Sequence, residues 1–342
     1  MSAVPIAASS PPPRVDGFGV VPGIIWAFRI HEDGTAEALP VDKPIENRHD
    51  GWLWLHLNLT DMRAVNWAQT ARLPESATAL LASNCVHQQI HAEEDCIYGV
   101  FVDFVQGIDG CGDDFAHLHF VMTERLLISA RHHPISSVAS VRQAIERGGR
   151  RLRSVASLLE LIVEHVADAM DRLTDQLETE IDQIEDNLAL HTHDVERPKL
   201  ARARRTAVKM HRQLSGLRIL FHRFERESPE GLKPELRFAA GRLAQRLDAL
   251  DHEILALRER ARFLQDEVVR LAGEVTNRHL YVLSILTTLI LPPTLVTGIF
   301  GMNTKGLPFT DNESGFLLAA ALMAASAVAV YLLMRRVGVF KL

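Results

Sequence analysis

Apolar residues recur every three or four positions through much of the C-terminal half of the chain, from Leu152 onward. A first stripe, Leu152 to Leu188, predicts an amphipathic helix of roughly forty residues. The segment His191–Pro198 interrupts the pattern, and Pro198 suits the first turn of a second helix that reaches Arg226. The short connection favours an antiparallel hairpin.

A third stripe begins after the break at Ser228–Pro234 and alternates steps of three and four residues from Leu236 to Val275. It predicts helix packing along its whole length, and we expect it to supply the contacts by which copies of the chain assemble. No helix-breaking residue separates it from the next apolar segment, so this stalk helix should continue to Phe300.

Two uncharged apolar runs follow, the 21 residues Leu280–Phe300 and the 19 residues Phe316–Met334. Each is long enough to cross a bilayer as a helix. Basic residues precede the first run and follow the second, with Arg335 and Arg336 directly after it. The positive-inside rule therefore places both termini in the cytoplasm and the connecting loop outside.

The N-terminal part has a different pattern of short β-rich runs and short helical ones. The expected strands are Gly23–Ile30, Trp52–Leu57, Ile97–Val105, Ala116–Met122 and Leu126–Ala130, and the expected helices lie near Asp61–Ala71, Pro74–Ser83 and Pro134–Arg147. Strands interleaved with helices predict an α/β domain with a mixed sheet.

These patterns divide the chain into eight parts. They are a disordered tail (1–19), an α/β cytoplasmic domain (20–150), a helical hairpin (151–228), a stalk helix (235–279), the first span (280–300), an external loop (301–315), the second span (316–334) and a cytoplasmic tail (335–342).

The two hairpin helices carry opposite charge. Residues 160–186 hold ten acidic side chains and one basic one, whereas residues 197–226 hold ten basic side chains and one acidic one. We expect complementary faces to pair along the hairpin, which sets register more than stability. A second interpretation is that the acidic helix, in addition to this pairing, raises the local concentration of cations near the mouth of an ion path.

The first span has a face of small and hydroxyl residues, which either pack helices closely or line water. Two spans cannot enclose an aqueous path, so an ion path needs several copies around an axis. The candidate pore-lining residues are Asp266, Asn277, Leu280, Ser284, Thr287, Leu291, Thr294 and Gly298, and the lipid-facing ones are Val282, Ile285, Leu289, Val296 and Ile299. Leu280 suits a hydrophobic constriction, and Pro292 and Pro293 should bend the helix.

Composition narrows the function further. The net charge of −6 argues against nucleic-acid binding, which requires a basic surface. Three cysteines without paired short spacing indicate neither a disulfide framework nor a cysteine-rich zinc site. No metalloprotease motif, phosphate loop or nucleophile elbow occurs, so we expect no enzyme.

The tripeptide Gly301-Met302-Asn303, at the end of the penultimate span, resembles the signature of the CorA family of divalent-cation transporters. The Asn-x-x-Gly-x-Pro continuation resembles its ZntB zinc-transporter branch. Trp52–Leu57, Thr123–Ser129 and Ile184–Leu188 also resemble family segments, so the resemblance covers nearly the whole chain. It implies an α/β/α cytoplasmic domain, a stalk helix and a funnel-shaped homopentamer in a bacterial-type inner membrane, in contact with lipid.

The resemblance also assigns residue roles. Gly301, Met302 and Asn303 would form the outer selectivity filter, with the Asn303 amide holding a hydrated cation. Thr287 and Thr294 would bond to water further in. Lys305 stands where magnesium-type members often have an acidic residue, which favours Zn²⁺ transport, with proton coupling, over a Mg²⁺, Co²⁺ or Ni²⁺ channel. The transported divalent cation is then the only metal required, and no cofactor is expected.

Two other interpretations remain open. A membrane-anchored coiled-coil scaffold without transport explains the stalk and spans but not the tripeptide. The sixteen histidines suggest zinc sites, although no set has a complete four-ligand spacing. The candidate groups are His87, His91 and Glu94 on one helical face, His117 and His119 on one strand face, and the loop pairs His132/His133 and His191/His193.

Overall fold

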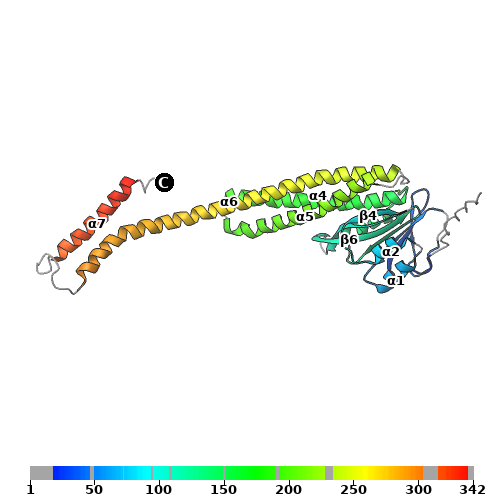
Figure 1. Ribbon diagram of the computed structural model, residues 1–342, viewed down its shortest axis with the longest axis horizontal. Coiled ribbons are helices and arrows are strands. Elements are labelled where there is room, and N and C mark those ends of the chain that lie inside the picture. The colour runs from blue at the N-terminus through cyan, green and yellow to red at the C-terminus, as the bar shows by residue number, and fades with distance from the viewer. Residues whose placement is uncertain are drawn as a thin grey trace, which may run out of the picture. The chain divides into compact units, whose positions relative to one another are not determined.

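The computed structural model describes residues 18–46, 50–71, 73–93, 95–107, 110–148, 151–189, 193–227, 234–302 and 315–337 (Figure 1). The chain forms two compact units. The first comprises Met1–Leu190 with Pro198–Phe263, and the second comprises His191–Arg197 with Leu264–Leu342. The long helix α6, Pro234–Phe300, contributes to both.

The first unit is built on one seven-stranded mixed sheet with the order β2-β1-β3-β7-β6-β5-β4. Strands β3 and β7 are parallel, and every other neighbouring pair is antiparallel. The strands are β1 (Ile24–Ile30), β2 (Ala36–Leu39), β3 (Trp52–Asn58), β4 (Gln89–Glu93), β5 (Cys96–Gly107), β6 (Gly110–Thr123) and β7 (Leu126–Arg131).

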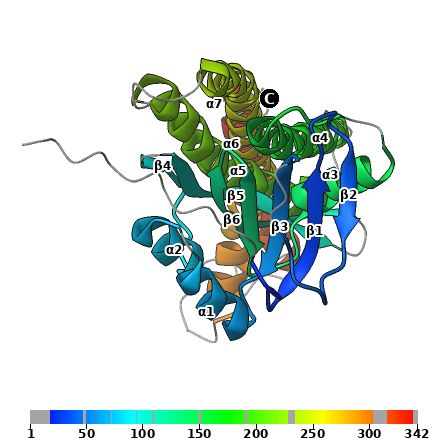
Figure 2. The ribbon, with the colours of Figure 1, turned by 90° about the vertical axis from the view of Figure 1, so that its right-hand side faces the viewer.

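Helices cover both faces of this sheet (Figure 2). One face packs on α1 (Met62–Thr70) and α2 (Glu75–Ala82), and the other on α3 (Ser136–Glu146) and α4 (Val155–Ala189). Because successive side chains of a strand point to opposite faces, Leu53, Leu55 and Leu57 of β3 all lie in the core on the α1–α2 side. The expected α/β/α layers and mixed sheet are therefore confirmed.

Strands β2 and β4 at the two sheet edges were not predicted from the sequence. Both are short and lack the buried alternation that marks a strand. The formation of β4 also corrects the expectation that His87 and His91 share a helical face, because His91 lies in this strand and stacks on Tyr98 of β5. Glu94 lies outside the described residues.

Three helices form a bundle in the first unit: α4, α5 (His193–Glu227) and the part of α6 before residue 264 (Figure 1). Helix α5 begins earlier than expected, so Pro198 lies inside the helix rather than in its first turn, at the cost of one backbone hydrogen bond. The stripe of α6 is buried within its own chain at Leu243, Leu247, Leu250, Ile254, Leu257 and Ala261.

That burial corrects the expected role of the α6 stripe. Its residues from Leu243 to Ala261 are at most 7% exposed, so they stabilise the bundle of one chain and are not available for contacts between copies. Beyond residue 268 the same helix is largely exposed, with Val269 and Val275 at 64% and 48%. Together with Phe263, which is 69% exposed, this later part offers apolar surface of α6 for contacts between copies.

Ion pairs connect both charged helices to α6. From α4, Glu160 pairs with Arg242, Asp168 with Arg246, and both Asp182 and Glu185 with Arg260. From α5, Arg218 and His222 pair with Asp248. Helix α6 thus supplies basic partners to α4 and an acidic partner to α5, and the pairing of α4 with α5 along the hairpin stays a prediction.

The second unit contains the rest of α6 and α7, Gly315–Val337. Within the described part of the chain, two helices are long and apolar enough to cross a membrane by length and composition, and their candidate segments are Ala239–Phe300 and Phe316–Val337. The expectation of a stalk that continues into the first span without interruption is confirmed by the single helix α6.

Candidate ion pathway

The candidate pore-lining residues lie along one exposed face of α6. A straight α-helix returns to the same face every 3.6 residues, so the steps of three and four align them. All eight side chains are exposed: Asp266, Asn277, Leu280, Ser284, Thr287, Leu291, Thr294 and Gly298. In one chain this face is open, as it must be if other copies are to complete a path.

The face that the sequence analysis assigned to lipid is mixed in its exposure. Ile285, Leu289 and Val296 are half-buried, whereas Val282 and Ile299 are exposed. Exposure within one chain therefore does not by itself separate the lipid-facing residues from the pore-lining ones.

A hollow of about 960 Å³ follows the polar face in the span. Four of the candidate residues line it, namely Thr287, Leu291, Thr294 and Gly298. The other six lining residues are apolar, namely Leu283, Leu286, Ile290, Leu295, Ile299 and Met302, so the two threonines are the polar groups of a largely apolar wall. Leu280 and Ser284 lie outside the lining, and Met302 extends the hollow to the C-terminal end of α6, where the signature tripeptide begins.

The threonine hydroxyls in this hollow have a fixed direction. Thr287 Oγ1 donates to the Leu283 carbonyl, and Thr294 Oγ1 donates to the Ile290 carbonyl, both over 2.8 Å. Since each proton is used in this way, the oxygen lone pairs remain for other donors. A hydrated cation presents the hydrogens of its water outward, so these oxygens suit the hydration shell.

Two prolines interrupt the backbone hydrogen bonds of the same segment. Pro292 and Pro293 lie inside α6 and have no N–H groups, so the carbonyls of Thr288 and Leu289 receive no helical hydrogen bond. In a membrane such carbonyls require water, a side chain or another helix. A water-lined position meets that requirement directly.

The geometry at the C-terminal end of α6 accounts for the glycine of the tripeptide. Gly301 N–H donates to the Thr297 carbonyl over 2.8 Å, and a Cβ at position 301 would approach that carbonyl to 2.9 Å. Glycine is therefore the residue that fits this last turn without a shift. Asn303 and Lys305, predicted for the filter and the loop, lie outside the described residues.

At the other end, Asp266 and Asn277 are exposed beside a chain of ion pairs. Arg270 contacts Glu267 and Glu274, three and four residues away on the same helix. Surface pairs of this kind contribute little to stability. They do neutralise charge next to Asp266, which leaves that carboxylate as a separate negative group.

Comparison with known proteins decides the family. The family described as CorA-like Mg²⁺ transporter protein matches residues 49–336. The chain belongs to this CorA-like family. Its members are transporters rather than enzymes, in agreement with the absence of an enzyme motif from the sequence.

Curated relatives of this CorA-like chain are similar over most of its length. It is 26% identical over 304 residues to the zinc transport protein ZntB of Enterobacter sp. (strain 638), covering 86% of this chain and 90% of the relative. It is 28% identical over 272 residues to ZntB of Yersinia enterocolitica, covering 77% and 80%.

Solved structures share the CorA-like fold. The full-length CmaX protein matches with a TM-score of 0.77 and 23% identity, covering 92% of this chain and 97% of that one. The CorA magnesium transporter from Methanocaldococcus jannaschii matches with a TM-score of 0.74 and 20% identity, covering 91% and 97%.

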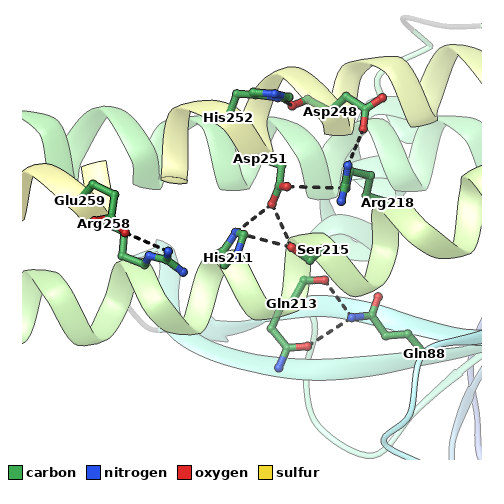
Figure 3. A network of polar contacts seen from close by, with 10 residues as sticks. All are labelled: Gln88, His211, Gln213, Ser215, Arg218, Asp248, Asp251, His252, Arg258 and Glu259. Carbon is green, nitrogen blue, oxygen red and sulfur yellow. Dashed lines mark hydrogen bonds and ion pairs between the residues drawn. The ribbon is translucent and has the colours of Figure 1, made fainter. Parts of the chain in front are cut away.

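The CorA-like chain also has a polar network that the sequence analysis missed (Figure 3). Asp251 of α6 accepts hydrogen bonds from His211 Nδ1 and Ser215 Oγ, each over 3.0 Å, and lies 3.6 Å from Arg218 Nε. The amide of Gln88, before β4, donates to the Gln213 carbonyl of α5. These hydrogen bonds connect the edge of the sheet to α5, and α5 to α6.

Asp248 extends this network by one helical turn. Desolvation raises its pKa, but hydrogen bonds from His222 and Arg218 outweigh that effect and leave the pKa below its usual value. The only sequence signal was the presence of Asp248 and Asp251 near an apolar stripe. Their partners come from another helix, so spacing alone does not identify them.

Proposed function

We propose that this protein transports divalent metal cations, most specifically Zn²⁺, across a membrane through a pore lined by α6 in a homo-oligomer. The observation that carries the proposal is the hollow along α6, in which Thr287 and Thr294 present hydroxyl oxygens beside apolar Leu291. Such a wall passes ions with their hydration shell rather than through direct soft ligands.

The choice of Zn²⁺ rests on the relatives and on Lys305. The curated relatives cited above are named zinc transport proteins. A ring of Lys305 at the outer mouth would repel cations unless Asp311 or Glu313 pairs with it, which favours proton-coupled transport over simple electrostatic attraction. Mg²⁺, Co²⁺ or Ni²⁺ conduction remains the second candidate, because the matching family and a solved neighbour are described as magnesium transporters.

The assembly follows from the same geometry. One chain supplies two spans, so several copies must surround an axis, and we propose the pentamer that the family resemblance implies. Both termini would lie in the cytoplasm of a bacterial-type inner membrane, since Arg278 precedes the first span and Arg335 and Arg336 follow the second. Asn303 would form the outer ring with Gly301 and Met302.

The test is a flux assay in proteoliposomes that contain the purified protein. Zn²⁺ and Mg²⁺ entry are measured separately, with and without an inward proton gradient. Zn²⁺ flux that rises with the gradient is the expected result. Mg²⁺ flux that is indifferent to the gradient would assign the chain to the second candidate. No flux of either ion from a folded oligomer would favour a non-transporting scaffold.

A further inference from the structure

Histidines that are separate in the sequence gather on the α2 side of the sheet. His117 and His119 lie in β6 with side chains on the same face, because alternate residues of a strand point the same way. His132 follows β7, the strand that pairs with β6. The imidazole centroids of His119 and His132 are 5.5 Å apart, with the rings at 68°.

His119 is held as a neutral, oriented imidazole. Its side chain is 1% exposed, and burial lowers its pKa to about 4, against the opposing hydrogen bonds to backbone carbonyls. Nδ1 lies 3.2 Å from the Leu80 carbonyl of α2. A carbonyl only accepts, so in this contact Nδ1 carries the proton and Nε2 is the ring nitrogen that would bind a metal. A carbonyl on the second ring nitrogen is the usual way in which a metal-binding histidine is oriented.

The two neighbouring histidines are also biased toward the neutral form. Burial lowers the pKa of His117, and His87 adds to this effect. Burial also lowers the pKa of His132, with a further contribution from His133. These mutual electrostatic effects agree with the proximity of the histidines on this side of the sheet.

The spacing of the rings fits zinc. Two imidazoles on one tetrahedral Zn²⁺, with bonds of about 2.0–2.1 Å, have centroids about 5 Å apart. The pair His119 and His132 is close to that value. Among the residues that the structure describes, no three ligating side chains already surround a common point. His117, which is half-buried on the same strand face, must therefore turn to a new rotamer to complete the set.

We propose that His117, His119 and His132 bind a borderline-soft divalent cation such as Zn²⁺ on the sheet of the first unit, with water as the fourth ligand. All three residues lie outside α6, so this site does not depend on which cation the pathway carries. The C-terminus of α2, which supplies the Leu80 carbonyl, adds a favourable partial negative charge.

The test measures Zn²⁺ binding at equilibrium to the full-length chain in detergent, by competition with a chromophoric chelator. The wild type is compared with the double variant His117→Gln/His132→Gln, in which both replaced side chains are half-buried. A matched control is His91→Gln/His252→Gln, with two exposed histidines from β4 and α6. His119 is left intact because its replacement would disturb the core.

The wild type and the control are each expected to bind one additional Zn²⁺ per chain compared with the double variant. If the double variant still binds this Zn²⁺, its affinity should be at least about tenfold lower. Co²⁺ bound to the same proteins should give tetrahedral absorption that the double variant loses. Equal stoichiometry and affinity in all three proteins would overturn the proposal, as would the absence of Zn²⁺ binding to the wild type. If circular dichroism shows that the double variant is unfolded, the single variant His132→Gln must show the same loss.

Binding without a membrane gradient also separates this proposal from the transport function. A chain that binds Zn²⁺ through these histidines but shows no flux would contradict only the transport proposal. A chain that transports Zn²⁺ with unchanged binding in the double variant would contradict only the histidine site.

Discussion

The Nδ1 atom of His211 in α5 lies 3.0 Å from Oδ1 of Asp251 in α6. This carboxylate is 7% exposed and also contacts Ser215 and Arg218, so it connects the two helices inside the bundle. The same helix continues beyond this contact to the candidate pathway. This polar contact therefore holds the N-terminal part of α6 against α5, and the same helix carries the proposed pore face further along.

We expect Asp251→Ala to lower the free energy of unfolding by about 1–2 kcal/mol, since it leaves the half-buried donors His211, Ser215 and Arg218 without their acceptor. Thermal unfolding of the purified protein, followed by circular dichroism, measures the effect. Asp175→Ala is the matched control, because Asp175 is an exposed aspartate of α4. Equal destabilisation by the two variants would contradict the role of the network.

The buried carboxyl group of Asp103 in β5 should make the stability of the folded protein depend on pH. Burial raises its pKa to about 7, although Ser137 and the Phe104 N–H donate hydrogen bonds to the carboxylate. In the folded protein the carboxyl group keeps its proton up to about pH 7, whereas in the unfolded chain it loses the proton near the ordinary aspartate pKa of 3.8. Stability from this group is therefore lost as pH rises between these two values.

The variant Asp103→Asn should remove that contribution. Denaturant unfolding at several pH values in this interval measures the slope of the free energy against pH. The wild type is expected to lose stability relative to the variant as pH rises. Parallel slopes for the two proteins would show that Asp103 does not titrate in this interval.

The threonine hydroxyl groups that line the hollow can be removed by valine substitutions, which keep nearly the same side-chain shape. Thr287→Val and Thr294→Val should each lower cation flux by about fivefold or more, because a hydrogen bond of about 1 kcal/mol to the hydration shell is lost in every copy. Thr297→Val is the control, since Thr297 is exposed and bonded to a backbone carbonyl but does not line the hollow. A similar loss in the control would indicate a general effect on the helix.

Asn303→Ala should preserve the oligomer and abolish selective flux, because the outer ring loses its amide oxygens. Flux of Zn²⁺ and Mg²⁺ is compared with that of the wild type, and size-exclusion chromatography checks assembly. Asn84→Ala, an exposed asparagine of the loop before β4, serves as the control. Wild-type selectivity in the Asn303 variant would refute the assigned filter role.

The sequence alone determined the parts of this protein that depend on local patterns. The long helices α4 and α6, the two spans and the central strands β3 and β7 follow from hydrophobic period and run length, which are properties of neighbouring residues. The polar face of α6 is likewise fixed by helical geometry. The short edge strands β2 and β4 were missed because their pairing, rather than their own pattern, makes them strands.

Only the tertiary structure decided which distant groups meet. Opposite charges on α4 and α5 predicted a pairing of these helices, and the structure adds α6, which packs beside both and supplies Arg246 to α4 and Asp248 to α5. The proximity of His119 and His132 arises from the pairing of β6 with β7, and the hydrogen bond from His211 to Asp251 arises from helix packing. Spacing along a chain defines faces, whereas packing of the apolar faces determines which polar groups are placed opposite one another.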